Sequence, residues 1–248
     1  GGDGGWGGIR MPALLVPGLM GLMLGFALGA HLLARAKPSV RGDFCWGLGL
    51  MWFGIANAVA LPLHCWVSPL APLWAELYAS TISFYSCACV TAVFGFLANC
   101  GVIDDGETDI HGTVLSFCLF VLIVSSNLTT RAQVAGKDST VQMLLELVVI
   151  LPIIAMALMG AFKWATRGGG GAWLAVAAAA LTSIGAAIVW DAQLCDALGP
   201  ALGPHAVVFG CVACDVLAMA LWKQHMAGRA AAAVEEAAAR AQQAQVAA

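Results

Sequence analysis

Seven long apolar segments follow one another along this chain, and they constrain its fold more than any other feature. Their ranges are 12–34, 44–65, 76–98, 112–129, 142–163, 172–193 and 204–225. Each is close to the length of about 20 residues that carries a helix across about 30 Å of hydrocarbon. Because a helix satisfies its own backbone hydrogen bonds, it is the natural way for such a segment to cross a bilayer. The pattern predicts an all-α, multi-pass integral membrane protein, a seven-transmembrane-helix bundle.

The composition supports a membrane location. Of 248 residues, 61% are hydrophobic and 10% are charged, whereas a soluble domain carries about 25% charged residues. No basic stripe or nucleic-acid-binding motif is present, which argues against nucleic acid as a partner. We expect the partners to be membrane lipids and, if the protein is a subunit, other membrane proteins.

The charged residues concentrate outside the apolar segments and divide the chain into three parts. Residues 1–11 form a flexible Gly-rich lead, 12–225 the transmembrane domain, and 226–248 an Ala-rich tail that favours a helix exposed to solvent. The odd loops and the C-terminus carry most Lys and Arg: Arg35, Lys37, Arg41, Lys163, Arg167, Lys223, Arg229 and Arg240. The N-terminus and even loops carry only Arg10, Arg131 and Lys137. This asymmetry predicts an outer N-terminus and a cytosolic C-terminus.

With this topology, ionisable side chains from four helix ends share the outer membrane surface. They are His64, Glu76, Asp191 and His205. Two imidazoles and two carboxylates suit a zinc site, and they equally suit a polar latch between helix ends. In the first case we predict His64 and His205 as metal ligands, Glu76 and Asp191 as catalytic carboxylates, and zinc as the cofactor. In the second case no cofactor is needed.

Asp215 lies near mid-depth in the last apolar segment. A charge at that depth costs about 3 kcal/mol. We therefore expect Asp215 to be protonated, or hydrogen-bonded to a polar side chain such as Asn57, Ser83, Ser116 or Ser183.

Small residues recur within the apolar segments. Six cysteines lie inside them and are interpreted as small buried side chains: Cys45, Cys87, Cys89, Cys118, Cys211 and Cys214. Cys65 and Cys195, near helix ends, can pair if that side is oxidising. Gly21, Gly25 and Gly29 are spaced by four and permit close helix contact, either with a partner subunit or within the bundle.

Three stretches of the chain resemble the alkaline ceramidases and the wider CREST superfamily of seven-helix membrane hydrolases. One is His64 followed by Leu73-Trp74-Ala75-Glu76-Leu77. Another is Ser83-Phe84-Tyr85-Ser86-Cys87. The last is Trp190-Asp191-Ala192-Gln193-Leu194-Cys195 ahead of Pro204-His205-Ala206.

The resemblance implies a zinc held by three His, with a Ser one turn before the first His and an acidic residue further on. His64 and His205 match the first two ligands, and Glu76 lies near the acidic position. Phe209 stands at the third ligand position and Ala60 at the Ser position. The resemblance thus implies a relative with a degraded metal and Ser site, a pseudoenzyme.

These observations leave three hypotheses. The lost Ser and third His favour a non-catalytic accessory or scaffold subunit of a membrane assembly, so we lean towards a protein that is not an enzyme. The alternative is a zinc-dependent hydrolase of lipid amides, in which two His and a carboxylate form the site. A receptor or transporter is the third hypothesis, but a retinal protein is disfavoured because the last segment contains no Lys before Lys223.

Overall fold

The structure of the chain is a computed structural model. It describes residues 14–35, 42–68, 71–99, 102–103 and 108–135, then 151, 154–155, 157–162, 165–166, 178, 228, 232 and 234–243. The main part holds four helices, α1 (Leu15–Arg35), α2 (Asp43–Cys65), α3 (Pro72–Asn99) and α4 (Thr108–Ala135). All four contain a stretch long and apolar enough to cross a membrane.

The regular structure that is described is entirely helical, which confirms the all-α class. Four spanning helices are the pattern of a multi-pass integral membrane protein. The three later apolar segments and the predicted orientation fall largely outside the described residues, so the count of seven helices stays a prediction. In the tail, residues 234–243 form an exposed helix in which Arg240 pairs with Glu236 one turn earlier.

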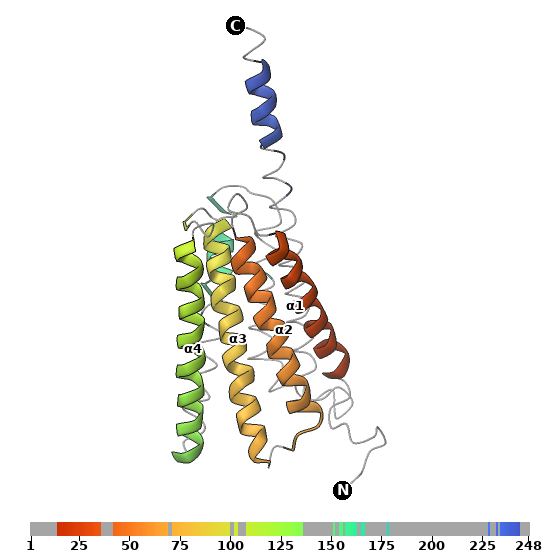
Figure 1. The fold of residues 1–248 in the computed structure, drawn as a ribbon, viewed down its shortest axis with the longest axis vertical. Helices are drawn as coiled ribbons and strands as arrows, with labels where there is room; N and C mark the ends of the chain where they lie inside the picture. The colour runs from red at the N-terminus through yellow and green to blue at the C-terminus, as the bar shows by residue number, and fades with distance from the viewer. Residues whose placement is uncertain are drawn as a thin grey trace.

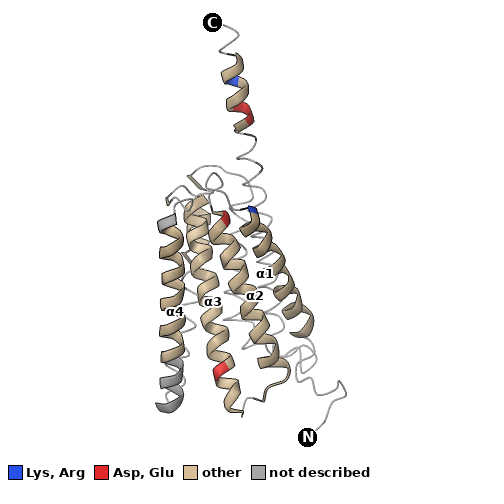
Figure 2. Cartoon of the chain, in the orientation of Figure 1, with Lys and Arg blue, Asp and Glu red and all other residues tan. Residues whose placement is uncertain are grey.

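The four helices lie side by side in chain order, with α1 and α4 at the two edges (Figure 1). Successive helices run in opposite directions. The end of α2 and the start of α3 therefore share one end of the bundle, which we call the His64 end. The end of α1 and the starts of α2 and α4 share the opposite end. Figure 2 shows the charged residues of α1, α2 and α3 near these two ends, with an uncharged middle.

The helices extend past the apolar segments that predicted them. The third helix begins at Pro72 rather than near 76, and the fourth covers Thr108–Ala135 rather than 112–129. Hydropathy marks only the part of a helix that sits in hydrocarbon, whereas the backbone hydrogen bonds continue through the polar interface. Pro72 also suits a first helical position, where a backbone N–H has no partner within the helix.

Glycines form the contact between α1 and α2. The buried residues of α1 are Gly18, Gly21, Gly25 and Gly29. A Cβ added at Gly25 would lie 2.6 Å from the backbone N of Gly54, so the two backbones touch. The glycine run therefore packs within the same chain. α2 occupies this face, which leaves it closed to a partner subunit.

One hydrogen bond and one left-handed glycine tie α2 to α3 at the end opposite His64. The indole N–H of Trp46 donates to Oδ1 of Asn99 at 2.8 Å, and its ring lies against Gly95, where an added Cβ would be 2.7 Å from Cδ1. Gly42, with φ of 86°, precedes α2. A side chain there would collide with Asn99, so Gly42 serves both the turn and the close approach.

Small polar side chains form the contact between α3 and α4. Ser83 and Ser125 share a hydrogen bond of 2.5 Å between their hydroxyl oxygens. A core cluster continues from there, formed by Cys45, Cys87, Val114, Cys118 and Val121. Cys45, Cys87 and Cys118 are buried, as predicted, and Cys89 is half-buried.

Large apolar side chains cover the outer faces of the two edge helices. On α1 these are Val16, Leu19, Met20 and Met23, and on α4 they are Leu115, Phe117, Leu119, Phe120 and Ile123. Such faces are typical of helices that contact lipid acyl chains or another membrane protein.

Candidate functional site

His64 lies in the last turn of α2 and is half-buried. Pro62 brings this helix to its end, because the backbone N–H groups of Trp66 and Val67 both donate to its carbonyl oxygen, at 3.1 and 2.9 Å. The imidazole is therefore placed at a helix end, where the sequence predicted it.

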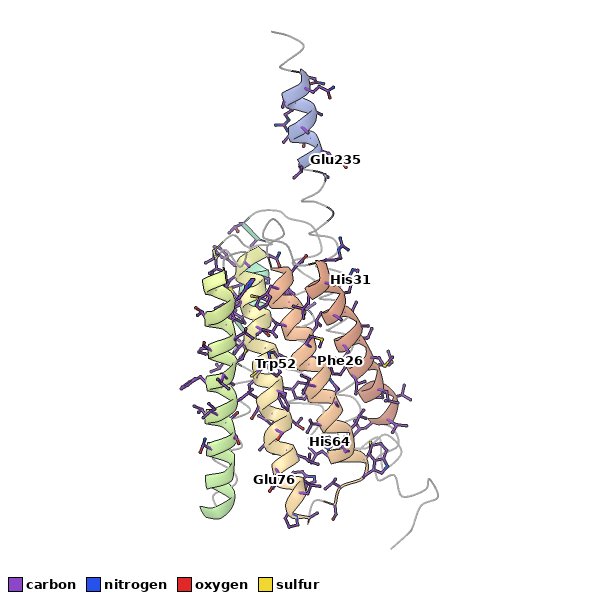
Figure 3. All side chains as sticks on the ribbon, in the orientation of Figure 1. Phe26, His31, Trp52, His64, Glu76 and Glu235 are labelled. Atoms are coloured by element: carbon purple, nitrogen blue, oxygen red, sulfur yellow. The ribbon has the colours of Figure 1, made fainter. Side chains whose placement is uncertain are left out.

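Glu76 is the fifth residue of α3 and its side chain is exposed. Its backbone carbonyl oxygen accepts a hydrogen bond of 2.8 Å from the hydroxyl of Ser80. Figure 3 places His64 near the end of α2 and Glu76 near the start of α3, at the same end of the bundle. Two of the four predicted site residues thus lie at one end of the bundle.

The other two predicted residues, Asp191 and His205, lie outside the described residues, as does Asp215. Across the described part of the chain, no three His, Cys, Asp or Glu side chains gather into a group that can hold a metal ion. The predicted zinc site therefore depends on segments beyond this part, and it stays a prediction.

The His64 end of the bundle contains apolar and aromatic side chains. Cys65 is fully buried in a small cluster with Leu14 and Leu61. Trp74 stacks on Tyr78 with ring centroids 5.1 Å apart. Aromatic side chains of this kind are typical of the ends of membrane-spanning helices.

Ala60 lies one turn before His64 and is fully buried. The resemblance to the ceramidases places a Ser hydroxyl there. In this chain a methyl group fills that position, so His64 has no hydroxyl one turn away on its own helix.

Two of the side chains expected to partner Asp215 donate hydrogen bonds elsewhere. The amide of Asn57 donates to the carbonyl of Phe53 at 2.9 Å, and the hydroxyl of Ser83 lies 2.8 Å from the carbonyl of Ala79. These bonds satisfy polar groups within their own helices.

Sequence reasoning missed a second polar cluster, which lies between α3 and α4. Cys87 donates from its sulfur to the carbonyl oxygen of Cys118 at 3.5 Å, and Trp52 packs against this pair from α2. Within the described part of the chain, the buried indole N–H of Trp52 has no hydrogen-bond partner. The i, i+4 spacing of Ser83 and Cys87 is the signal that places both on one face of α3.

Comparisons of the chain with models of protein families, with curated proteins and with solved structures find no match. The resemblance to the alkaline ceramidases therefore stands on the quoted residues alone.

Proposed function

We propose that this protein is a non-catalytic seven-helix membrane protein, with its N-terminus outside and its C-terminus in the cytosol. It acts as an accessory or scaffold subunit of a membrane assembly. A cluster formed by His64, Glu76, Asp191 and His205 serves as a polar latch between its outer helix ends.

The observation that carries this proposal is the fully buried methyl group of Ala60 one turn before His64. The resemblance to the ceramidases implies a Ser hydroxyl at this position of the hydrolytic site. Glu76 is exposed, which suits an interfacial latch or a headgroup contact as well as it suits catalysis. The loss of the third His at Phe209 points the same way.

The subunit role is supported by the outer face of α4. This edge helix buries a narrow stripe formed by Val114, Cys118, Val121 and Ser125, while Phe117 and Phe120 remain exposed. Aromatic side chains offer a large contact area at low conformational cost. Because α2 covers the glycines of α1, a partner has to use a face such as this one.

Native mass spectrometry after gentle extraction with natural lipids tests the proposal. We expect the chain in a complex with a second polypeptide at fixed stoichiometry. The combined Phe117→Ala and Phe120→Ala substitutions should release that polypeptide, and the combined Val16→Ala and Met20→Ala substitutions on α1 serve as the matched control. A lone chain in every gentle extract contradicts the subunit role, and release of a fatty acid from lipid amides by the purified protein contradicts the absence of catalysis.

One observation favours a second candidate, a zinc-dependent hydrolase of lipid amides. His64 and Glu76 lie at the same end of the bundle (Figure 3), and the predicted topology brings His205 and Asp191 to that end. Bound zinc would polarise the amide carbonyl and activate water. His64 and His205 would hold it, and Glu76 or Asp191 would take the proton from the attacking water.

Metal analysis separates the two candidates. Stoichiometric zinc in the wild-type protein, lost in His64→Ala and retained in His31→Ala, supports the hydrolase. His31 is an exposed His on α1, which makes it a fair control. Protein that is purified without chelators and contains no zinc ends this candidate.

A further inference from the structure

The last two turns of α1 carry an imidazole and a guanidinium that are hydrogen-bonded to each other. Nη1 of Arg35 lies 3.3 Å from Nε2 of His31, and both side chains are exposed. A guanidinium can only donate, so Nε2 accepts and the ring proton of His31 is on Nδ1. Within the described part of the chain this is the one hydrogen bond of either side chain, so several N–H groups remain for a further acceptor.

Arg35 also lacks an acidic partner among the residues that the structure describes, where it forms no ion pair. The sequence contains no Asp or Glu between Asp3 and Asp43, and Lys37 and Arg41 follow Arg35 in the chain. Asp43, the first acidic residue after Arg35, is only 6% exposed. The sequence around the end of α1 therefore carries a net positive charge, to which an anion is complementary.

The length of α1 matches the thickness of a membrane. Its 21 residues, Leu15–Arg35, rise about 31 Å at 1.5 Å per residue, close to the hydrocarbon thickness of about 30 Å. A helix of this length that crosses the hydrocarbon brings its last residue, Arg35, to the headgroup region. Figure 3 shows His31 near this end of α1, away from the His64 end. The anion closest to hand at such a position is a lipid phosphate.

A row of exposed side chains continues from the charged pair along α1. Met23, Ala27, His31 and Arg35 are spaced by four, which places neighbours in the row one above the other, and all four are exposed. The rise from Met23 to Arg35 is about 18 Å, similar to one leaflet, which is half of the hydrocarbon thickness. An acyl chain can therefore lie on the apolar part of the row while its headgroup is held at the charged end.

We propose that His31 and Arg35 bind the phosphate of an anionic phospholipid, with one acyl chain of that lipid along Ala27 and Met23. The planar guanidinium matches two phosphate oxygens, and a basic residue at the surface attracts anionic lipids. Phosphatidylglycerol fits better than phosphatidylcholine, because the choline cation of the latter already neutralises its phosphate. This site is independent of the function proposed above, since it uses neither the His64 end nor the outer face of α4.

Lipid titration of the full chain in detergent micelles, followed by native mass spectrometry, tests the headgroup contact. We expect the wild-type protein to bind phosphatidylglycerol more tightly than phosphatidylcholine. Arg35→Gln should weaken phosphatidylglycerol binding about fivefold, the effect of one basic residue near an anionic lipid surface. Arg35→Lys keeps the charge but not the planar fork, so its loss should be smaller. Arg240→Gln is the matched control, because Arg240 is an exposed arginine that pairs with Glu236 in the tail helix.

Ala27→Trp tests the acyl-chain contact, because it fills the apolar part of the row without changing any charge. We expect it to weaken phosphatidylglycerol binding, whereas Leu119→Trp, at an exposed position of α4, should not. Glycerol phosphate, which has the phosphate without the acyl chains, distinguishes a lipid site from a site for a free phosphate. At the concentration of the lipid it should not displace phosphatidylglycerol.

Equal affinity of the wild-type protein for the two lipids overturns the proposal, as does an equal loss of phosphatidylglycerol binding in Arg35→Gln and Arg240→Gln. Displacement of the lipid by glycerol phosphate, or unchanged binding in Ala27→Trp, rules out a phospholipid along this row. Circular dichroism shows whether each variant keeps the helical content of the wild-type protein. The comparison of the two lipids on the wild-type chain needs no substitution, so it decides the question even if a variant fails to fold.

Discussion

The α1–α2 contact and the α3–α4 contact hold their helices together in different ways. Between helices in a membrane the hydrophobic effect contributes little, so association depends on close packing and hydrogen bonds. In the first contact, glycines form the buried face of α1, so the backbones touch. In the second, the hydroxyls of Ser83 and Ser125 and the thiol of Cys87 reach across.

The glycine contact has a polar component of its own. A Cβ added at Gly29 would lie 3.0 Å from the carbonyl oxygen of Gly47, and one added at Gly47 would lie 3.1 Å from that of Gly29. Because a Cβ replaces a hydrogen, each Cα–H points at the oxygen of the other helix, a weak hydrogen bond of about 0.5–1 kcal/mol. The α1–α2 contact should therefore be sensitive to added atoms, and the α3–α4 contact to removed ones.

The largest effect should come from Gly25→Leu. Its side chain would have to occupy space 2.6 Å from the backbone N and 2.7 Å from the Cα of Gly54, and no rotamer moves the Cβ. We expect a loss of about 3 kcal/mol in the free energy of unfolding, measured by denaturation in detergent micelles. Ala27→Leu, on the exposed face of α1, is the control. If both substitutions cost the same, α1 does not pack through its glycines.

Gly21→Ala should cost less, about 1–2 kcal/mol, because its Cβ would meet a side chain rather than backbone. The obstacle is Oδ1 of Asn57 at 2.8 Å. The double variant with Asn57→Ala should lose less unfolding free energy than the sum of the two single losses, because the second substitution removes the obstacle. Strict additivity in the same unfolding assay would show that the two residues are not in contact.

The α2–α3 contact combines close packing at glycine with a hydrogen bond, and Trp46→Phe tests the hydrogen bond. This substitution keeps an aromatic ring against Gly95 but removes the 2.8 Å bond to Asn99. We expect a loss of about 1 kcal/mol. In the Asn99→Ala variant, Trp46→Phe should then cause no further loss of unfolding free energy. A further loss of the same size as in the wild-type protein would argue against the bond.

Ser83→Ala should have the smallest effect, about 0.6 kcal/mol, which is the average for hydrogen bonds between membrane helices. It removes the link to Ser125 across the α3–α4 contact. Ser80→Ala is the matched control, because the Ser80 hydroxyl bonds only to the Glu76 carbonyl of its own helix among the bonds described. A cost no greater than that of the control would mean that Ser83 does not hold α4.

Hydropathy predicted where the first four spans lie, because it indicates whether a segment lies in hydrocarbon or in water. It could not predict that the third helix starts at Pro72, since the interface tolerates polar helical residues. Spacing by four predicted that Gly21, Gly25 and Gly29 make a close contact. The identity of the partner, α2, is a tertiary fact that a single-helix pattern does not contain.

In the candidate site, too, local features could be predicted and contacts between distant segments could not. Pro62 and the turn after it allowed the position of His64 to be predicted, because they act locally. The meeting of Cys87 with Cys118 was missed, because each lies in an apolar run where a cysteine looks like any small side chain. The convergence of His64 with His205 depends on packing between distant segments, and it stays a prediction.

The glycines that form the buried face of α1 have a consequence for biogenesis. Glycine has no rotamers to immobilise, and only residues 36–42 separate Arg35 from Asp43, so closing this loop costs little entropy. The hairpin of α1 and α2 can therefore form without contacts to the rest of the polypeptide. It can assemble while the ribosome is still producing α3, and so give each later span a finished surface to insert against.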